Sequence, residues 1–156
     1  MLLAVATGCE QATCGAYYEQ GQTYYVKVFP GFKSVTAETI QKGLDYWVVL
    51  GYDFRVGDQG YSATIEPMSE WYVQQGFAGL GAAVPGQIML RDESWLEANF
   101  VAHEIGHLLG VSHQDIGDCN VMANSACYRD DLSELDIVAW TRRVSWCPDP
   151  APTPVR

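Results

Sequence analysis

All three histidines of the chain lie in one short stretch, residues 101–113, which reads VAHEIGHLLGVSH. An α-helix turns about 100° per residue, so His103 and His107 would lie one turn apart on the same face. Glu104 would lie beside that face. The opposite face would carry only apolar side chains, namely Val101, Ala102, Ile105, Leu108 and Leu109. The stretch therefore predicts a helix that buries one face and presents two imidazoles on the other.

Two imidazoles at this spacing commonly bind one zinc ion. Gly110 can adopt a positive φ, end the helix and turn the chain back, so that His113 reaches the same ion. Three protein ligands leave a fourth position open, which marks a catalytic zinc site rather than a structural one. The alternative is a helix whose polar face happens to carry histidines. Five fixed positions, each at about one in twenty, make a chance match rare.

The spacing HExxHxxGxxH resembles the signature of the metzincin metalloproteases. Residues 99–113 and 131–137, NFVAHEIGHLLGVSH and DLSELDI, are similar to the matrixin branch of that family. The resemblance implies that Met122, in the segment NVMA, belongs to a methionine turn and forms an apolar floor under the imidazoles. It also implies that Asn99 lines the main specificity pocket.

The resemblance further implies an α+β fold of the metzincin type. This fold has a twisted mixed, mostly parallel sheet with an antiparallel edge strand, and two long helices that include the zinc helix. A small C-terminal subdomain would hold the methionine turn and the last helix. The strand near residues 80–84 would be the antiparallel edge, which pairs with the substrate backbone.

Local patterns place these elements along the chain. β-branched and aromatic residues or alternation predict strands at residues 24–29, 52–56, 61–66, 80–84 and 87–91. Thr36 is the expected N-cap of a helix that Gly51 ends and that buries Ile40, Leu44, Trp47 and Val48. The zinc helix is expected from Ser94 to Leu109, with acidic residues near its start. Ser133 and Asp136 have the form of a capping box for a last helix that runs to about Val144 and buries Ile137, Trp140 and Val144.

Three departures from the family limit the resemblance. No histidine remains for the second, structural zinc of animal matrixins, so only one zinc ion is expected. Most glycines and aspartates of the calcium loops are missing, which leaves calcium binding open. No tyrosine closely follows Met122, so the tyrosine ligand of astacin-like members has no counterpart.

The length of 156 residues fits one domain. We expect an irregular N-terminal segment at residues 1–23, the catalytic domain at 24–147 and a proline-rich tail at 148–156. The first segment is the remnant of a secretion signal, with Cys9 as a possible lipid anchor, a short pro-segment, or simply a mature N-terminus. The net charge of −10 argues against nucleic acid and anionic membranes as partners. No run of about 18 apolar residues predicts a transmembrane helix.

The five cysteines indicate an oxidising compartment, so we expect a secreted or extracytoplasmic surface protein. Cys119 and Cys127 flank Met122 and are expected to be bridged. Cys147 is expected to pair with Cys14 or Cys9, which leaves one cysteine over. Residues 13–15, TCG, are also similar to the matrixin cysteine switch, in which a thiolate blocks the zinc, although a plain disulfide is favoured for Cys14.

The sequence therefore predicts a monomeric zinc metalloendopeptidase that hydrolyses peptide bonds of a protein or peptide substrate. His103, His107 and His113 would bind the zinc ion, and Glu104 would be the general base that acts on a zinc-bound water. Two alternatives stay open. One is a zinc-bearing binding module, or a latent or inactive protease scaffold; the other is an amidase or deformylase-like hydrolase that acts on non-protein amides.

Overall fold

A five-stranded sheet with the order β2-β1-β3-β5-β4 organises the computed structural model, which describes residues 18–74, 81–114, 119–123 and 128–146. The strands are β1 (Thr23–Val28), β2 (Asp53–Val56), β3 (Ala63–Pro67), β4 (Gly81–Val84) and β5 (Gln87–Leu90). All neighbours are parallel except β4, which pairs antiparallel with β5 at one edge. The prediction of an α+β fold with a mostly parallel sheet and an antiparallel edge strand is confirmed.

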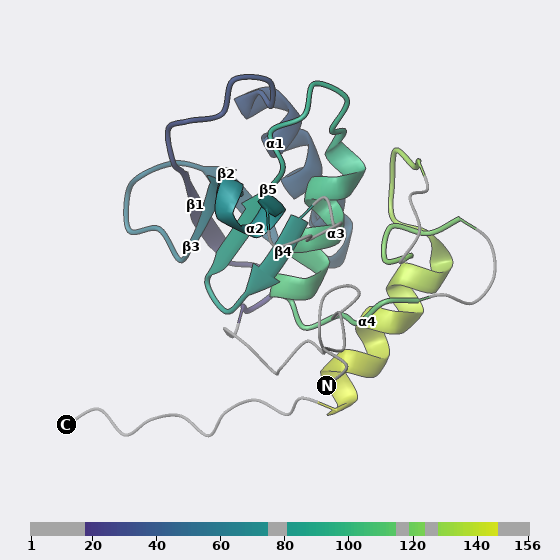
Figure 1. Cartoon of the computed structure of the whole chain (residues 1–156). Coiled ribbons are helices and arrows are strands. Elements are labelled where there is room, and N and C mark those ends of the chain that lie inside the picture. Colours follow the sequence, from purple (N-terminus) through teal and green to yellow (C-terminus); the bar gives the residue numbers. More distant parts are fainter. Residues whose placement is uncertain (1–17, 75–80, 115–118, 124–127, 147–156) are drawn as a thin grey trace, which may run out of the picture.

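Two helices cover one face of this sheet and pack against each other (Figure 1). They are α1 (Ala37–Asp45), which continues as the 3₁₀ helix η1 (Tyr46–Leu50), and α3 (Ala98–Leu108). A short α2 (Glu70–Gln74) follows β3, and α4 (Glu134–Trp146) lies apart from the sheet, beyond α3 (Figure 1). No helix within the described ranges has the length and apolar character needed to span a membrane.

The contact between α1 and α3 requires a glycine. A Cβ at Gly43 would lie 2.6 Å from the carbonyl oxygen of Ala98 and would also overlap the side chain of Val101. The core beneath this contact is formed by the inward side chains of the strands, which are fully buried: Val26, Phe54, Ile65 and Ile88. The backbone of α3 is therefore fixed at close range against α1 and the sheet.

The predicted first helix is correct at both ends but not throughout. The Oγ1 of Thr36 accepts a hydrogen bond from the backbone N–H of Thr39 at 3.1 Å, and Gly51 ends the element with a φ of 86°. After Asp45 the helix tightens into the 3₁₀ form, which changes the direction of each later side chain. Trp47 is still buried, whereas Val48 is 51% exposed, so its predicted burial was wrong.

The predicted start of the zinc helix at Ser94 was also wrong, because α3 begins at Ala98 with Glu97 as its N-cap. Asp92 has another role than to favour the helix dipole. Its carboxylate accepts hydrogen bonds from the backbone N–H groups of Lys33, Ser34 and Val35 at 2.6–3.0 Å. These hydrogen bonds join the segment after β5 to the loop before α1, and α3 begins only after this segment.

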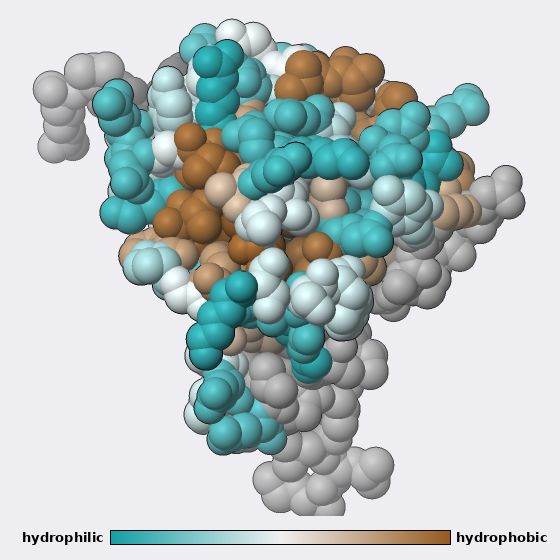
Figure 2. All heavy atoms as spheres, turned by 90° about the horizontal axis from the view of Figure 1, so that it is seen from above, coloured by the Kyte–Doolittle hydropathy of each residue, from teal (hydrophilic) through white to brown (hydrophobic). Residues whose placement is uncertain are grey.

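The remaining elements agree with their predicted positions to within a few residues, except α2, which the sequence patterns did not predict. Figure 2 shows apolar patches separated by hydrophilic side chains on the face seen from above. The predicted roles of Cys9, Cys14, Cys127 and Cys147 lie outside the described residues, as do the proline-rich tail and the inward packing predicted for Val144. Within the described part, Cys119 is disulfide-bonded.

Candidate metal centre

The structure brings the three histidines together. The Nε2 atoms of His103 and His107, both on α3, lie 3.0 Å apart. The Nε2 atom of His113 lies 3.1 Å from each of them. One nitrogen atom of each residue is thus directed to a common point, as the sequence predicted.

The return of His113 to the helix depends on Gly110. Its φ of 83° is in the left-handed region, which favours glycine. The N–H of Gly110 donates to the carbonyl of His107 at 2.9 Å, and the N–H of Val111 donates to the carbonyl of Gly106 at 2.8 Å. These two bonds satisfy the last carbonyl groups of α3 and reverse the chain. The expected glycine turn is confirmed.

Backbone carbonyls orient two of the imidazoles. The Nδ1 of His103 lies 2.6 Å from the oxygen of Val121, and the Nδ1 of His107 lies 2.8 Å from the oxygen of Val111. A carbonyl oxygen only accepts, so each Nδ1 must carry the proton and each Nε2 must present its lone pair. The lone pairs of His103 and His107 therefore face each other at 3.0 Å, which is unfavourable unless a cation lies between them.

A zinc ion fits this arrangement. Zn–N bonds of 2.0–2.1 Å in a tetrahedral site place ligand nitrogens about 3.3 Å apart, close to the observed 3.0–3.1 Å. Burial lowers the pKa of His103 to about 4 and the pKa of His107 to about 3. Both rings are therefore neutral at pH 7, and neutral imidazole is the form that binds metals.

Glu104 is buried between α3 and the edge strand β4. Burial raises the pKa of its carboxyl group to about 8. The Oε2 atom has no hydrogen-bond partner among the described residues. A Cβ at Gly81, the first residue of β4, would lie 2.6 Å from Oε1 and 2.8 Å from Cδ, so the glycine leaves the space that the carboxyl group occupies. A buried oxygen without a partner is costly for a fold and typical of a group that acts on a ligand.

A turn at residues 120–123 packs against the middle of α3. Met122 is fully buried, and a Cβ at Gly106 would overlap its side chain and lie 2.9 Å from the Cζ2 of Trp47. The N–H of Gln114 donates to the carbonyl of Met122 at 2.8 Å. The predicted position of Met122 as a floor under the imidazoles stays a prediction, since the contact observed here is with Gly106.

The sequence did not identify Asp136 as part of this site. It predicted only the capping box, which the structure confirms: the Oγ of Ser133 accepts from the N–H of Asp136 at 3.2 Å, and the carboxylate of Asp136 accepts from the N–H of Ser133 at 2.7 Å. The same carboxylate also accepts from the N–H groups of Val121 and Met122. No sequence pattern could show this second contact, because it joins segments from two elements.

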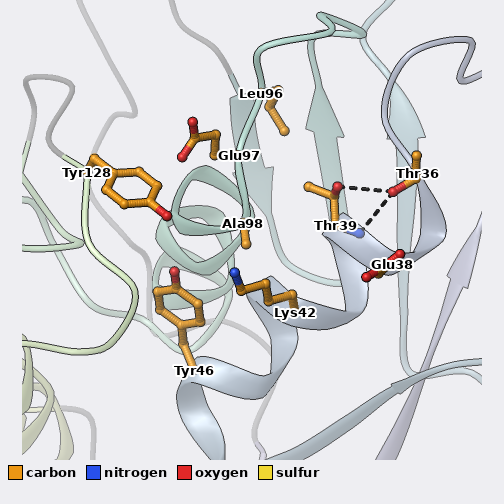
Figure 3. A pocket seen from close by; sticks show the side chains of 9 residues that line it. All are labelled: Thr36, Glu38, Thr39, Lys42, Tyr46, Leu96, Glu97, Ala98 and Tyr128. Atoms are coloured by element: carbon orange, nitrogen blue, oxygen red, sulfur yellow. Dashed lines mark hydrogen bonds between the residues drawn. The ribbon is translucent and has the colours of Figure 1, made fainter.

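A separate hollow of about 450 Å³ lies between α1 and the N-terminal end of α3 (Figure 3). Lys42 of α1 and Tyr46 at the start of η1 line it, and Tyr128 lies beside Tyr46 at the same end (Figure 3). None of the three histidines lines this hollow. Asn99, the expected specificity residue, is buried on α3, and its role in specificity stays a prediction.

Comparison with known proteins gives likenesses in structure only. No family model and no curated protein matches the chain. The structure is similar to that of high choriolytic enzyme 1, a hatching enzyme zinc-protease from Oryzias latipes (medaka fish), with 15% identity and a TM-score of 0.43 over 68% of this chain and 53% of that one. The chain thus spans about half of that protein. It is also similar to myroilysin, with 14% identity and a TM-score of 0.49 over 97% of this chain and 74% of that one.

Proposed function

We propose that this chain is a zinc-dependent endopeptidase of the metzincin type. The observation that carries the proposal is the convergence of three Nε2 atoms to within 3.1 Å of one another. Glu104, the residue that follows the first of these histidines, is buried. The spacing HExxHxxGxxH supports the metzincin type. The matrixin-like subtype rests on the sequence of residues 99–113 and 131–137.

In this proposal His103, His107 and His113 hold the zinc ion and leave its fourth position open. When bound, zinc acts as a Lewis acid that activates water and polarises the carbonyl of the scissile bond. Glu104 takes the proton from the attacking water and then delivers it to the leaving nitrogen, as general base and general acid. Burial alone favours the protonated carboxyl group, whereas the positive charge of a bound zinc ion would favour the ionised form that acts as the base. The unpartnered Oε2 of Glu104 is the atom that supports this role.

The edge strand β4 supports a peptide as substrate. Among the described strands, β4 pairs with β5 only, so its other edge offers backbone N–H and C=O groups. An extended peptide can add to such an edge, and its backbone then supplies affinity with little sequence preference. Gly81, which contacts Glu104, begins this strand, so a peptide bound along β4 would pass close to the base. An open edge favours peptides over the small amides of an amidase.

We further propose that the protein acts outside the cytoplasm as a monomer. The disulfide-bonded Cys119 supports an oxidising compartment. The zinc-bearing binding module is the less favoured alternative, because a binding site gains nothing from a buried carboxyl group without a partner, whereas its burial has a cost.

Hydrolysis of a quenched-fluorescent peptide library tests this function, with wild type, chelator-treated wild type and Glu104→Ala compared. We expect cleavage that the chelator abolishes and zinc restores. Glu104→Ala should retain zinc and lose activity by about 10²–10⁴-fold, the usual contribution of a general base. Glu134→Gln, an exposed glutamate in the first turn of α4, is the matched control and should cleave normally. Zinc-bound wild type that cleaves no peptide would favour the binding module instead.

A further inference from the structure

The hollow between α1 and the N-terminal end of α3 combines an apolar lining with charged edges (Figure 3). Leu96, Ala98 and Tyr46 line it and are buried. Glu38 and Glu97 also line it, but their side chains are exposed. Its volume of about 450 Å³ falls within the range of about 300–1,000 Å³ that is usual for ligand sites. The hollow is therefore large enough for a long side chain.

The negative charge at the hollow is not balanced by the described residues. Lys42 extends its ammonium group toward α3 (Figure 3) and pairs with Asp130 at 3.9 Å. Glu38 and Glu97 have neither an ion pair nor a hydrogen-bond partner for their carboxylates within the described ranges. Glu97 is the N-cap of α3, yet its side chain does not cap the helix. Two carboxylates thus remain available to a ligand.

Two tyrosines add to this preference for positive charge. The hydroxyl of Tyr46 donates to the carbonyl of Arg129 at 2.6 Å, so it is not available to a ligand. The hydroxyl of Tyr128 donates to Asp130 at 2.7 Å. Burial, and then the negative charge of Asp130, raises the pKa of Tyr46 to about 12, so this ring stays neutral. The faces of such rings attract cations, whereas the carboxylates repel anions.

A long cationic side chain matches this hollow better than a metal ion. Among the described residues, only the three histidines bring their ligand atoms close enough to hold one ion. Arginine and lysine side chains have an apolar stem and a charged end group. The stem would lie on the buried lining, and the charged end would reach the carboxylates. The net charge of −10 further favours a basic partner.

The hollow is separate from the metal centre, although both lie along α3. Ala98 precedes His103 by five residues, which corresponds to about 140° around the helix and about 7.5 Å along it. The two sites therefore lie on different faces of α3. A helix is about 10 Å wide and an extended chain spans about 3.3 Å per residue. A substrate segment in the hollow would thus lie at least about four residues from the scissile bond.

We propose that this hollow binds an arginine or lysine side chain from a basic segment of the protein substrate, away from the scissile bond. The choice of a substrate as the partner rests on the proposed function. The binding itself requires neither zinc nor hydrolysis. The hollow would add affinity for proteins in which a basic segment lies several residues from an accessible peptide bond.

A titration followed by nuclear magnetic resonance tests the binding. The zinc-loaded Glu104→Ala protein would be used so that the probe stays intact. The probe is the blocked pentapeptide GRGRG, compared with analogues that carry citrulline, which is neutral, or glutamate in place of arginine. We expect shifts at the amides of Thr39, Ala98 and Tyr128 with the arginine peptide only, and weaker binding at high salt. No shifts, or equal shifts with the citrulline or glutamate peptide, would overturn the proposal.

The carboxylates are tested by the double variant Glu38→Gln/Glu97→Gln. Both side chains are exposed, so the variant should fold normally. Exposed ion pairs are individually weak, and we expect the arginine peptide to bind about three- to tenfold more weakly. The matched control is Glu19→Gln/Glu134→Gln, which makes the same change in net charge at exposed positions elsewhere. Equal weakening in both double variants would show that only the overall charge matters and would contradict the proposal.

Lys42→Met gives a test with the opposite sign. It removes a competing cation that lines the hollow and is paired with Asp130. The arginine peptide should therefore bind about two- to fivefold more tightly. Lys27→Met is the matched control, because Lys27 forms a similar ion pair with Asp58 at 3.8 Å on the sheet. Unchanged binding in Lys42→Met, or an equal gain in both variants, would contradict the assigned site.

The kinetics of cleavage test whether the partner is a substrate. Two fluorogenic peptides would be compared, one with two arginines about six residues from the scissile bond and one with glycines there. In the background with Glu104 intact, Glu38→Gln/Glu97→Gln should raise KM about three- to tenfold for the arginine peptide only and leave kcat unchanged. Unchanged KM values would overturn the substrate as the occupant. A chain that cleaves no peptide would overturn the proposed function and this occupant, whereas the titration would still decide whether the hollow binds a basic side chain.

Discussion

Helix α3 is held on two sides by different forces. On the side of α1 and the sheet the contacts are apolar and tight, as at Gly43 against Val101 and at Trp47 against Gly106. On the side of the histidines the imidazoles are held by hydrogen bonds to backbone groups, at Val111 and at the turn of residues 120–123, and Met122 of that turn adds an apolar contact at Gly106. The comparison indicates that the two sides of α3 have different roles. The apolar side provides stability, and the polar side sets the geometry of the metal centre.

Trp47→Ala should have the largest effect, because it breaks the apolar side. The side chain is fully buried, and its Nε1–H donates to the carbonyl of Ala102 on α3 at 2.9 Å. Truncation of a buried tryptophan lowers the free energy of unfolding by about 3–5 kcal/mol. Urea unfolding would measure this loss. Val49→Ala, at a side chain that is 71% exposed in the same 3₁₀ helix, is the control and should change stability by less than about 0.5 kcal/mol.

The same pair of variants tests whether the two sides are separable. Folded Trp47→Ala should bind zinc nearly as tightly as wild type, since no metal-binding histidine contacts the indole in a hydrogen bond or a ring contact among the described residues. A large loss of zinc affinity in the folded variant would show that the division between the two sides of α3 is wrong.

Gly81→Val should act on catalysis alone, because position 81 faces Glu104 and not the imidazoles. Valine favours strands, so β4 should form, but its Cβ would displace the carboxyl group. A displacement of about 1 Å can lower the rate about 100-fold, so we expect kcat to fall by roughly 10–100-fold with zinc content unchanged. Ala82→Val is the matched control on the opposite face of the strand. Equal kcat losses in the two variants would contradict the assigned contact.

Asp92→Asn should have the smallest effect and sharpens the comparison, because it removes polar contacts that lie away from the metal. Partial burial raises the pKa of Asp92. The three hydrogen bonds from the backbone N–H groups of Lys33, Val35 and Ser34 outweigh this effect and hold the pKa below its ordinary value. The ionised form therefore stabilises the fold above the unfolded pKa of about 3.9, and this stability is lost as the pH falls through the lower folded pKa.

Thermal or urea unfolding from pH 7 to pH 2 would measure this dependence. Asp92→Asn should be less stable than wild type by about 1 kcal/mol at pH 7, and the difference should shrink below about pH 4. Zinc affinity should not change. A difference that grows as the pH falls would contradict the assigned role of the carboxylate.

The features of the site that could be predicted are those that one helix and one glycine determine. Helical geometry places His103 and His107 together, and the positive φ of Gly110 returns His113 to them. The start of α3 could not be predicted in the same way. It depends on Asp92, which bonds to a loop nearly 60 positions earlier in the chain.

Asp136 shows the same limit more clearly. Its capping box was predictable because Ser133 lies three positions away. Its bonds to Val121 and Met122 were not, because they depend on how α4 docks against the turn. A sequence pattern reports local geometry, whereas the partners of a buried carboxylate are decided by tertiary packing.

The zinc content of the purified chain tests the central claim most directly. Wild type and His107→Ala would be dialysed against the same zinc-buffered solution and analysed by plasma mass spectrometry. The account predicts one zinc ion per chain in wild type and none in His107→Ala, because the two remaining imidazoles bind the ion too weakly. Wild type without zinc, or His107→Ala that retains zinc at the wild-type level, would contradict it.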